Sequence, residues 1–177
     1  MFYIIGLGNP GEEYKETRHN VGRLAVDFFV AKTDLPIKKF FMIESKEFMN
    51  NSGKAVVKFI KNKKIAQNLI VVHDDIDLPL GTLKISYNKG VGGHRGLDSV
   101  VKAVKTKEFT RIRIGVAPTT PGGKIKKPSG EKAVIDFILG KFKPKETEIL
   151  KKIFKKVSEA INTIIEEGRD KAMNRFN

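Results

Sequence analysis

The stretch of sequence that decides the fold reads Leu69-Ile70-Val71-Val72-His73-Asp74-Asp75. Its first four residues are all apolar, and a continuous apolar run of this kind is typical of a central strand that is covered on both faces. The run stops abruptly at three polar residues. The pattern therefore predicts a buried strand over residues 69–72, with His73, Asp74 and Asp75 directly after its end.

Strand and helix patterns alternate on both sides of this strand. Upstream, residues 2–5 form another apolar run, and the apolar residues within 21–28 repeat with the spacing of one helix face. A second helix is predicted to begin at Ser52, which would cap it. Downstream, residues 83–87 and 111–116 are predicted to be strands.

Three further segments complete the predicted domain. The glycine-rich loop at 90–96 leads into another helical pattern, and residues 118–130 hold three Pro and three Gly, which predicts a mobile surface loop or lid. From about residue 145 a long basic helix is predicted. Its buried stripe would consist of Ile149, Ile153, Val157, Ala160 and Ile164.

This alternation of strands and helices predicts the α/β fold class. We expect a single three-layer domain over residues 1–177, in which a twisted, mixed and mostly parallel sheet is flanked by helices. No segment resembles an interdomain linker, and no internal repeat is evident.

The charge balance points to an anionic partner. Lys and Arg number 34 against 20 Asp and Glu, which gives a formal net charge of +14. Nucleic acid is the first candidate for such a surface, and a Lys-rich surface that serves solubility is the alternative. The absence of Cys excludes thiol catalysis and fits a reducing compartment. No apolar stretch approaches the ~18 residues of a membrane span. We therefore expect a cytoplasmic protein without a membrane partner.

A glycine pattern after the first predicted strand resembles a nucleotide-binding motif. Gly6-Leu7-Gly8-Asn9-Pro10-Gly11 matches G-x-G-x-x-G. In dinucleotide-binding folds such a pattern passes straight into a helix that holds the pyrophosphate. Here the next helical pattern begins only at about residue 21, and three Glu between them would repel phosphate. The sequence therefore disfavours a nucleotide site.

Candidate catalytic side chains lie near the ends of the predicted strands, where open α/β sheets bind ligands. Asn9 follows the first strand, Asn50 precedes the second helix, and His19 precedes the first helix. A neutral imidazole can take a proton from water and return it later, and a carboxylate on its far nitrogen stabilises the charged form. His19 with Asp74 or Asp75 is a candidate pair of this kind. The alternative is a purely structural histidine.

Two other chemistries are weaker. A metal site would use His73 with Asp74, Asp75 or Asp77, but alternate strand residues point to opposite faces and no regular two-His spacing is present. A serine nucleophile would need a G-x-S-x-G elbow, which the sequence lacks. Water is therefore the better candidate nucleophile.

Four blocks of sequence, in order along the chain, resemble the signatures of the bacterial-type peptidyl-tRNA hydrolase family. The first is the glycine pattern above with Tyr14 and Arg18-His19-Asn20-Val21-Gly22. The other three are Phe48-Met49-Asn50-Asn51-Ser52-Gly53, His73-Asp74-Asp75-Ile76-Asp77-Leu78-Pro79-Leu80-Gly81 and Gly92-Gly93-His94-Arg95-Gly96-Leu97. The resemblance implies an enzyme that hydrolyses the ester between a peptide and tRNA and so returns tRNA to translation.

The resemblance also assigns catalytic roles. His19 would be the general base, and Asp74 the carboxylate that holds it in its basic form. Asn50 would position the water and the ester carbonyl. Asn9 would contact the peptide and distinguish N-blocked peptidyl-tRNA from free aminoacyl-tRNA, although Pro10 gives it a possible turn role too. Water would attack without a covalent intermediate.

Substrate contacts follow from the same resemblance. The cleft for the terminal adenosine and the peptide would be lined by Tyr14, Phe48 and Met49, for which core packing is the alternative, and His94 belongs to the substrate-contacting block. In the family a basic pair contacts the 5′ phosphate of tRNA. Arg113 matches one member, whereas the usual lysine falls at Ser86, so Lys84 or Lys89 would substitute.

One further departure concerns the fourth block. Arg95 stands where the family has Asn, and it would either contact a phosphate or carbonyl of the substrate or point to solvent. The resemblance implies tRNA as partner, no cofactor, no metal and a monomer. The rival function is a non-catalytic RNA-binding protein on the same scaffold. Retention of His19, Asp74, Asn9 and Asn50 speaks against that rival.

Overall fold

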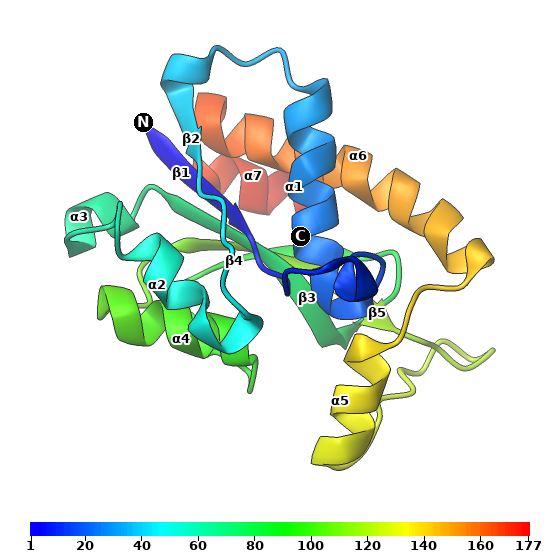
Figure 1. Ribbon diagram of the computed structural model, residues 1–177. Coiled ribbons are helices and arrows are strands. Elements are labelled where there is room, and N and C mark those ends of the chain that lie inside the picture. Colours follow the sequence, from blue (N-terminus) through cyan, green and yellow to red (C-terminus); the bar gives the residue numbers. More distant parts are fainter.

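Five strands form one sheet in the order β2-β1-β3-β5-β4 (Figure 1). The computed structural model describes all residues, 1–177. The strands are β1 (Phe2–Gly6), β2 (Phe40–Met42), β3 (Leu69–Pro79), β4 (Leu83–Tyr87) and β5 (Thr110–Ala117). Four strands pair in parallel, and only β4 runs antiparallel to its neighbour β5. The predicted mixed, mostly parallel sheet is confirmed.

Helices cover both faces of this sheet, which gives the predicted three layers (Figure 1). One face carries α1 (Val21–Lys32), α6 (Pro144–Glu167) and α7 (Arg169–Phe176). The other face carries α2 (Ser52–Val56), α3 (Lys63–Ala66) and α4 (Arg95–Val104). Helix α5 (Glu131–Leu139) stands beyond the edge of the layers. Four single 3-10 turns complete the list: η1 (Glu12–Tyr14), η2 (Arg18–Asn20), η3 (Ile37–Lys39) and η4 (Met49–Asn51).

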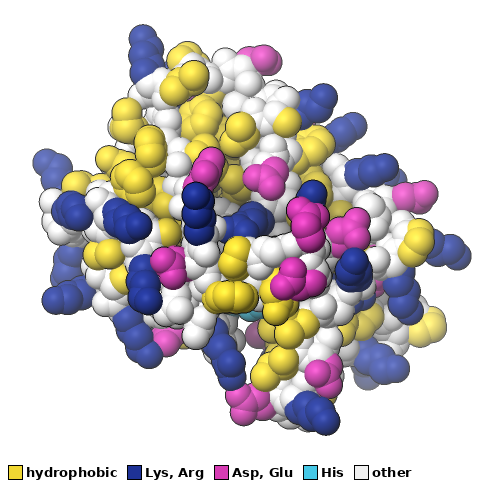
Figure 2. All heavy atoms as spheres, viewed as in Figure 1, with side chains coloured by type: hydrophobic (Ala, Val, Ile, Leu, Met, Phe, Trp, Pro, Cys, Tyr) yellow, Lys and Arg dark blue, Asp and Glu magenta, His cyan; other side chains and the backbone are white.

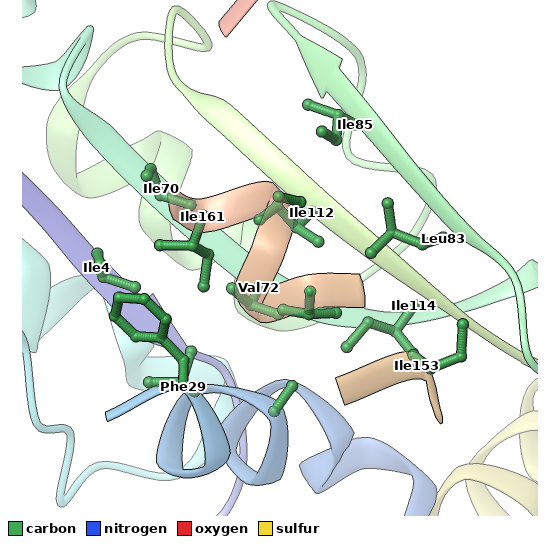
Figure 3. Packing of buried hydrophobic residues seen from close by; sticks show 14 of the residues in the cluster. Ile4, Phe29, Ile70, Val72, Leu83, Ile85, Ile112, Ile114, Ile153 and Ile161 are labelled. Carbon is green, nitrogen blue, oxygen red and sulfur yellow. The ribbon is translucent and has the colours of Figure 1, made fainter. Parts of the chain in front are cut away.

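The apolar run of β3 divides its side chains between two cores. Ile70 and Val72 pack with α1 and α6 in one cluster, part of which Figure 3 shows. Leu69 and Val71 pack in a second cluster with α2 and α4. All four are fully buried. Because both faces of the central strand are covered, every residue of the run must be apolar.

Strand β3 is longer than the sequence predicts. It continues past Val72 to Pro79, so His73, Asp74 and Asp75 lie inside the strand and not after its end. The reason is pairing with β5, in which Asp74 lies opposite Ile114 and Asp75 opposite Gly115. Polar residues remain in the ladder because the neighbouring strand supplies backbone partners whatever the side chains are.

Several helix details also differ from the predictions. Ser52 does not cap α2 but is its first residue, and its hydroxyl donates to the carbonyl of Met49 at 2.8 Å. Ile149 is 40% exposed, because the buried face of α6 begins instead at Leu150. The long C-terminal helix is interrupted at Gly168, whose φ of 95° separates α6 from α7.

Two close backbone approaches bring the first helix against the sheet. A Cβ atom at Gly6 of β1 would collide with the backbone of Gly22, and a Cβ at Gly22 would collide with the backbone of Val72 in β3. Only glycine allows this contact. The turn η2 just before α1, which carries His19, is thereby held beside the polar part of β3.

The outer edge of β4 is closed by the C-terminal segment. The side-chain oxygen of Asn177 accepts from the backbone N–H of Ile85 at 2.7 Å, and its amide nitrogen donates to the carbonyl of Ile85 at 3.0 Å. Arg169 of α7 lies over the ring of Tyr87, 3.7 Å from its centroid. Residues 118–130 contain no helix and no strand of the sheet, and none of their side chains is buried. Their mobility stays a prediction.

Candidate active site

A cavity of about 810 Å³ lies between the polar part of β3, the N-terminus of α4 and helix α5. Most of the predicted site residues line it: Asn9, His19, Phe48, Met49, Asn50, Asp74, His94, Arg95 and Arg113. Tyr14 and Lys84 do not line it. Segments 9–20, 48–50, 73–77 and 89–95, which are far apart in the sequence, therefore meet in one place.

His19 and Asp74 form a buried pair. The Nδ1 atom of His19 lies 3.0 Å from each carboxylate oxygen of Asp74, and the two side chains are 9% and 4% exposed. The Nε2 atom of His19 has no hydrogen-bond partner in the protein, and His19 lines the cavity. With Nδ1 donating to the carboxylate, Nε2 is the free acceptor. The pair thus presents a basic nitrogen to the cavity.

Two further histidines surround the same carboxylate. The Nε2 atom of His94 lies 3.0 Å from Oδ1 of Asp74, and the ring centroids of His19 and His94 are 5.1 Å apart. His73 is buried, and its Nδ1 donates to the backbone carbonyl of Asp74 at 2.6 Å. Burial, assisted by the charge of His94, lowers the pKa of His73 to about 3. His73 is therefore neutral at physiological pH and takes no part in proton transfer there.

The carboxylate of Asp74 stays ionised despite its burial. Desolvation by burial, acting alone, would raise its pKa, but the charges of His19 and His94 and the hydrogen bonds from both rings outweigh it. The pKa of Asp74 is held well below its usual range. A permanent negative charge therefore lies directly behind the Nδ1 atom of His19.

The two candidate amides differ in how firmly they are held. The backbone of Asn9 exchanges hydrogen bonds with the side chain of Asn20 at 2.8 and 2.9 Å, and its side-chain oxygen accepts from the N–H of Met49 at 2.8 Å. The amide nitrogen of Asn9 is thus left for the cavity. Asn50 is exposed and its side chain has no hydrogen-bond partner in the protein.

The predicted cleft residues divide into a surface pair and a core residue. Tyr14 and Phe48 meet edge to face with ring centroids 6.2 Å apart, and Phe48 is 52% exposed. Met49 is 4% exposed and belongs to the core cluster under α4, although it also lines the cavity. Met49 therefore meets both descriptions, and its role in the cleft stays a prediction.

The basic candidates lie on β4 and β5. The Nε of Arg113 donates to Asp75 at 2.7 Å. Lys84 is the register partner of Arg113 but is exposed outside the cavity, whereas Lys89 lines it. Arg111, which sequence reasoning left out, is buried and donates to the carbonyls of Lys89 and Gly90. Arg111 could have been found, because the alternation in Arg111-Ile112-Arg113 puts both arginines on one face.

Arg95 is exposed, but its side chain also contacts another residue of the protein. Its guanidinium contacts the carboxylate of Glu131 at 2.5 Å, so an ion pair links the start of α4 to the start of α5. Both side chains are more than half exposed, so the pair contributes little to stability.

Helix α5 supplies an apolar wall that the sequence analysis missed. Val134, Ile135, Ile138 and Leu139 all line the cavity, and Figure 2 shows apolar side chains gathered over this helix. Their spacing of one and four residues was the available signal. Elsewhere on this face Lys and Arg side chains are scattered over the surface, with Asp and Glu side chains between them (Figure 2).

Arg18 is a second residue whose role the sequence pattern does not indicate. Its guanidinium is bound to Glu146 at 2.9 Å and to the carbonyl of Lys141 at 3.0 Å, and it lies 4.6 Å from the ring centroid of Phe137. These contacts fasten η2, and with it His19, to the segment that joins α5 and α6.

Three potential metal ligands also meet here, and only Asp74 among them belongs to the predicted set. His19, Asp74 and His94 have ligand atoms within 4.8 Å of one another, whereas His73 points its Nδ1 to a backbone carbonyl. Hydrogen bonds of 3.0 Å account for the contacts of the three side chains. We assign no metal to them.

Comparison with known proteins gives a consistent result along the whole chain. A sequence model of the family described as peptidyl-tRNA hydrolase matches residues 3–177. A peptidyl-tRNA hydrolase of Thermodesulfovibrio yellowstonii is 39% identical over 199 residues, which cover 100% of this chain and 99% of the relative. One of Hydrogenobaculum sp. is 36% identical over 98% of this chain and 96% of the relative.

Solved structures agree with the sequence relatives. The crystal structure of peptidyl-tRNA hydrolase from Acinetobacter baumannii matches with a TM-score of 0.81 and 26% identity, and the match covers 100% of this chain and 94% of that one. None of the helices combines the length and the apolar character that spanning a bilayer requires.

Proposed function

This chain belongs to the peptidyl-tRNA hydrolase family, and is therefore an enzyme, and we propose that it hydrolyses the ester between the peptide carboxyl and the terminal ribose of tRNA by attack of a water that His19 activates. The resemblance of the four sequence blocks to this family is confirmed. The observation that carries the mechanism is the buried His19–Asp74 pair, whose free Nε2 lines the cavity.

In the proposed reaction His19 moves one proton in each direction. Nε2 takes a proton from water while the water oxygen bonds to the ester carbon, and the ring becomes an imidazolium that Asp74 stabilises. The tetrahedral intermediate then breaks its bond to the ribose oxygen, and that oxygen receives the proton from Nε2. Peptide carboxylate and free tRNA leave, and no covalent bond to the protein forms.

The two amides have separate proposed roles. Asn50, exposed and without a partner, donates to the carbonyl oxygen as it becomes negative and holds the water. The amide nitrogen of Asn9 is oriented by the bond from Met49 to its oxygen, so it faces an acceptor on the peptide. Free aminoacyl-tRNA carries a charged amino group there, which an amide donor binds poorly. Asn9 would thus favour N-blocked substrates.

The rest of the cavity provides substrate contacts. We propose that Phe48, with Tyr14 behind it, stacks on the terminal adenosine and that Met49 forms the base of this subsite. Arg113 and Lys89 are the proposed contacts for the tRNA 5′ phosphate, with Lys84 as the alternative lysine. Arg95 would leave Glu131 to bind a substrate phosphate or carbonyl. The enzyme would act in the cytoplasm as a monomer, without metal or cofactor.

The test of this function compares two substrates in the presence of a chelator. The purified protein is incubated with an N-blocked aminoacyl-tRNA and with its unblocked counterpart, and released amino acid is measured. We expect release from the blocked species alone. Binding of both without release would favour a non-catalytic RNA-binding protein, and release that the chelator abolishes would contradict the metal-free mechanism.

Salt dependence tests the phosphate contacts. Each phosphate contact should steepen the plot of log affinity against log salt by about 0.7 to 0.9. Arg113→Ala and Lys89→Ala are each expected to reduce the slope by about one contact, and Lys84→Ala is the comparison. Affinities are measured by filter binding of deacylated tRNA over a range of salt. An unchanged slope for Lys89→Ala with a reduced one for Lys84→Ala would exchange their roles.

A further inference from the structure

We propose that His94 is a positioning residue and not a substrate contact. The start of α4 locks its ring in one tautomer, and the ring orients the carboxylate of Asp74. His19 is then the only one of the three histidines that can accept the proton from water. The proposal deepens the hydrolase function and rests on it. It replaces the substrate contact that the sequence resemblance implies for this residue.

Both ring nitrogens of His94 are already in use. Nδ1 accepts a hydrogen bond from the backbone N–H of Leu97 at 3.2 Å, and this bond caps the N-terminus of α4. A nitrogen that accepts carries no proton, so the single proton of the neutral ring is on Nε2. Nε2 in turn donates to Oδ1 of Asp74 at 3.0 Å. Although His94 lines the cavity, no ring nitrogen is left to hydrogen-bond a substrate.

The lock decides which histidine of the group takes the proton. A proton added to His94 would have to go to Nδ1, where it would face the Leu97 N–H and break the cap. His19 has no such conflict, because its Nε2 has no partner and lines the cavity. His73, whose Nε2 is also unpartnered, is fully desolvated. The proton from water therefore goes to His19.

The same bond fixes the geometry of the carboxylate. Asp74 accepts from two rings, since His19 lies 3.0 Å from both of its oxygens while His94 lies 3.0 Å from Oδ1. The donor from His94 prevents rotation of the carboxylate about its Cβ–Cγ bond. Of the nearby charged side chains, Arg18 is bound to Glu146 and Arg113 to Asp75, while Arg111 donates to the carbonyls of Lys89 and Gly90. The side-chain hydrogen bonds of Asp74 are thus those with the two histidines.

Two conservative variants separate the two bonds of His94. The amide oxygen of Asn can take the place of Nδ1 and cap α4, but the side chain is too short to reach Asp74. The amide nitrogen of Gln can take the place of Nε2 and donate to Asp74, but no acceptor remains for Leu97. His94→Asn therefore keeps the cap alone, and His94→Gln keeps the bond to the carboxylate alone.

We expect opposite effects on rate and stability. His94→Asn should lower kcat by about 10- to 100-fold, the range for one hydrogen bond to a charged group, with KM nearly unchanged and wild-type thermal stability. His94→Gln should keep kcat within about threefold of wild type but melt at a lower temperature. Equal kcat in His94→Asn and wild type, or a raised KM as the main effect in both variants, would overturn the proposal.

A measurement on the unaltered protein keeps the proposal independent of these variants. In nitrogen NMR spectra of histidine-labelled protein without substrate, the His94 ring should carry its proton on Nε2 at neutral pH. A proton on Nδ1 would overturn the lock even if the enzyme is active. Conversely, an inactive wild-type protein with the expected tautomer would contradict the hydrolase function and leave the lock standing.

Discussion

Replacing His19 by Ala is expected to slow hydrolysis of N-blocked aminoacyl-tRNA by about 10²- to 10⁴-fold, the contribution of one positioned general base. The variant retains the apolar wall of α5 and the basic residues on β5, so affinity for tRNA should stay within a few-fold of wild type. Single-turnover rates and filter binding of deacylated tRNA measure the two quantities separately.

The same experiment has a matched pair of carboxylate variants. Asp74→Asn removes the charge that stabilises the imidazolium of His19 and should cost a similar factor. Asp136→Asn makes the identical chemical change on the exposed face of α5, outside the cavity lining, and should leave the rate unchanged. Full activity of His19→Ala would disprove the proposed base, and a rate loss in Asp136→Asn would show that the assay reports general damage.

The second large effect concerns unfolding in acid. Burial lowers the pKa of His73 from 6.5 to about 3, so between these values the unfolded chain binds a proton that the folded protein excludes. The stabilising contribution is complete above pH 6.5 and is lost as pH falls toward 3. Each pH unit in this window costs about 1.4 kcal/mol, and the loss between pH 6.5 and 4 amounts to about 3 kcal/mol.

His73→Asn tests this contribution. The Asn amide can still donate to the carbonyl of Asp74 in place of Nδ1, but it does not titrate. The free energy of unfolding from urea titrations should therefore depend on pH less steeply in the variant, by about one proton between pH 6.5 and 4. Asp74 adds its own acid sensitivity in both proteins, since its lowered pKa is also a source of stability that is lost at low pH. Parallel curves would mean that His73 is protonated in the folded state.

The sequence predicts those elements whose pattern depends on local burial. The strand at 69–72 and the helix face within 21–28 can be predicted from the residues alone. In both segments apolar residues of the pattern pack in the core. The end of β3 could not be predicted, because its polar half stays extended only through pairing with β5. The short strand β2 likewise depends on its parallel pairing with β1.

The candidate site follows a similar division. That His19 lies near Asp74 could be expected from the positions of both at strand and helix ends, and the structure brings the two side chains together. The second hydrogen bond to Asp74, from His94, could not be expected. It depends on the path by which the glycine-rich loop enters α4. The ion pair between Arg95 and Glu131 likewise joins the starts of α4 and α5, which are far apart in the sequence and come close only in the folded protein.

The amide of Asn177 has a consequence for self-association of the protein. The outer strand of a sheet is where a second molecule can add a strand of its own and start an aggregate. At the β4 edge the side chain of Asn177 already occupies both the donor and the acceptor of Ile85, so an incoming strand finds no continuous ladder there. The other edge strand of the sheet is β2, and at three residues it is too short to start a stable intermolecular sheet.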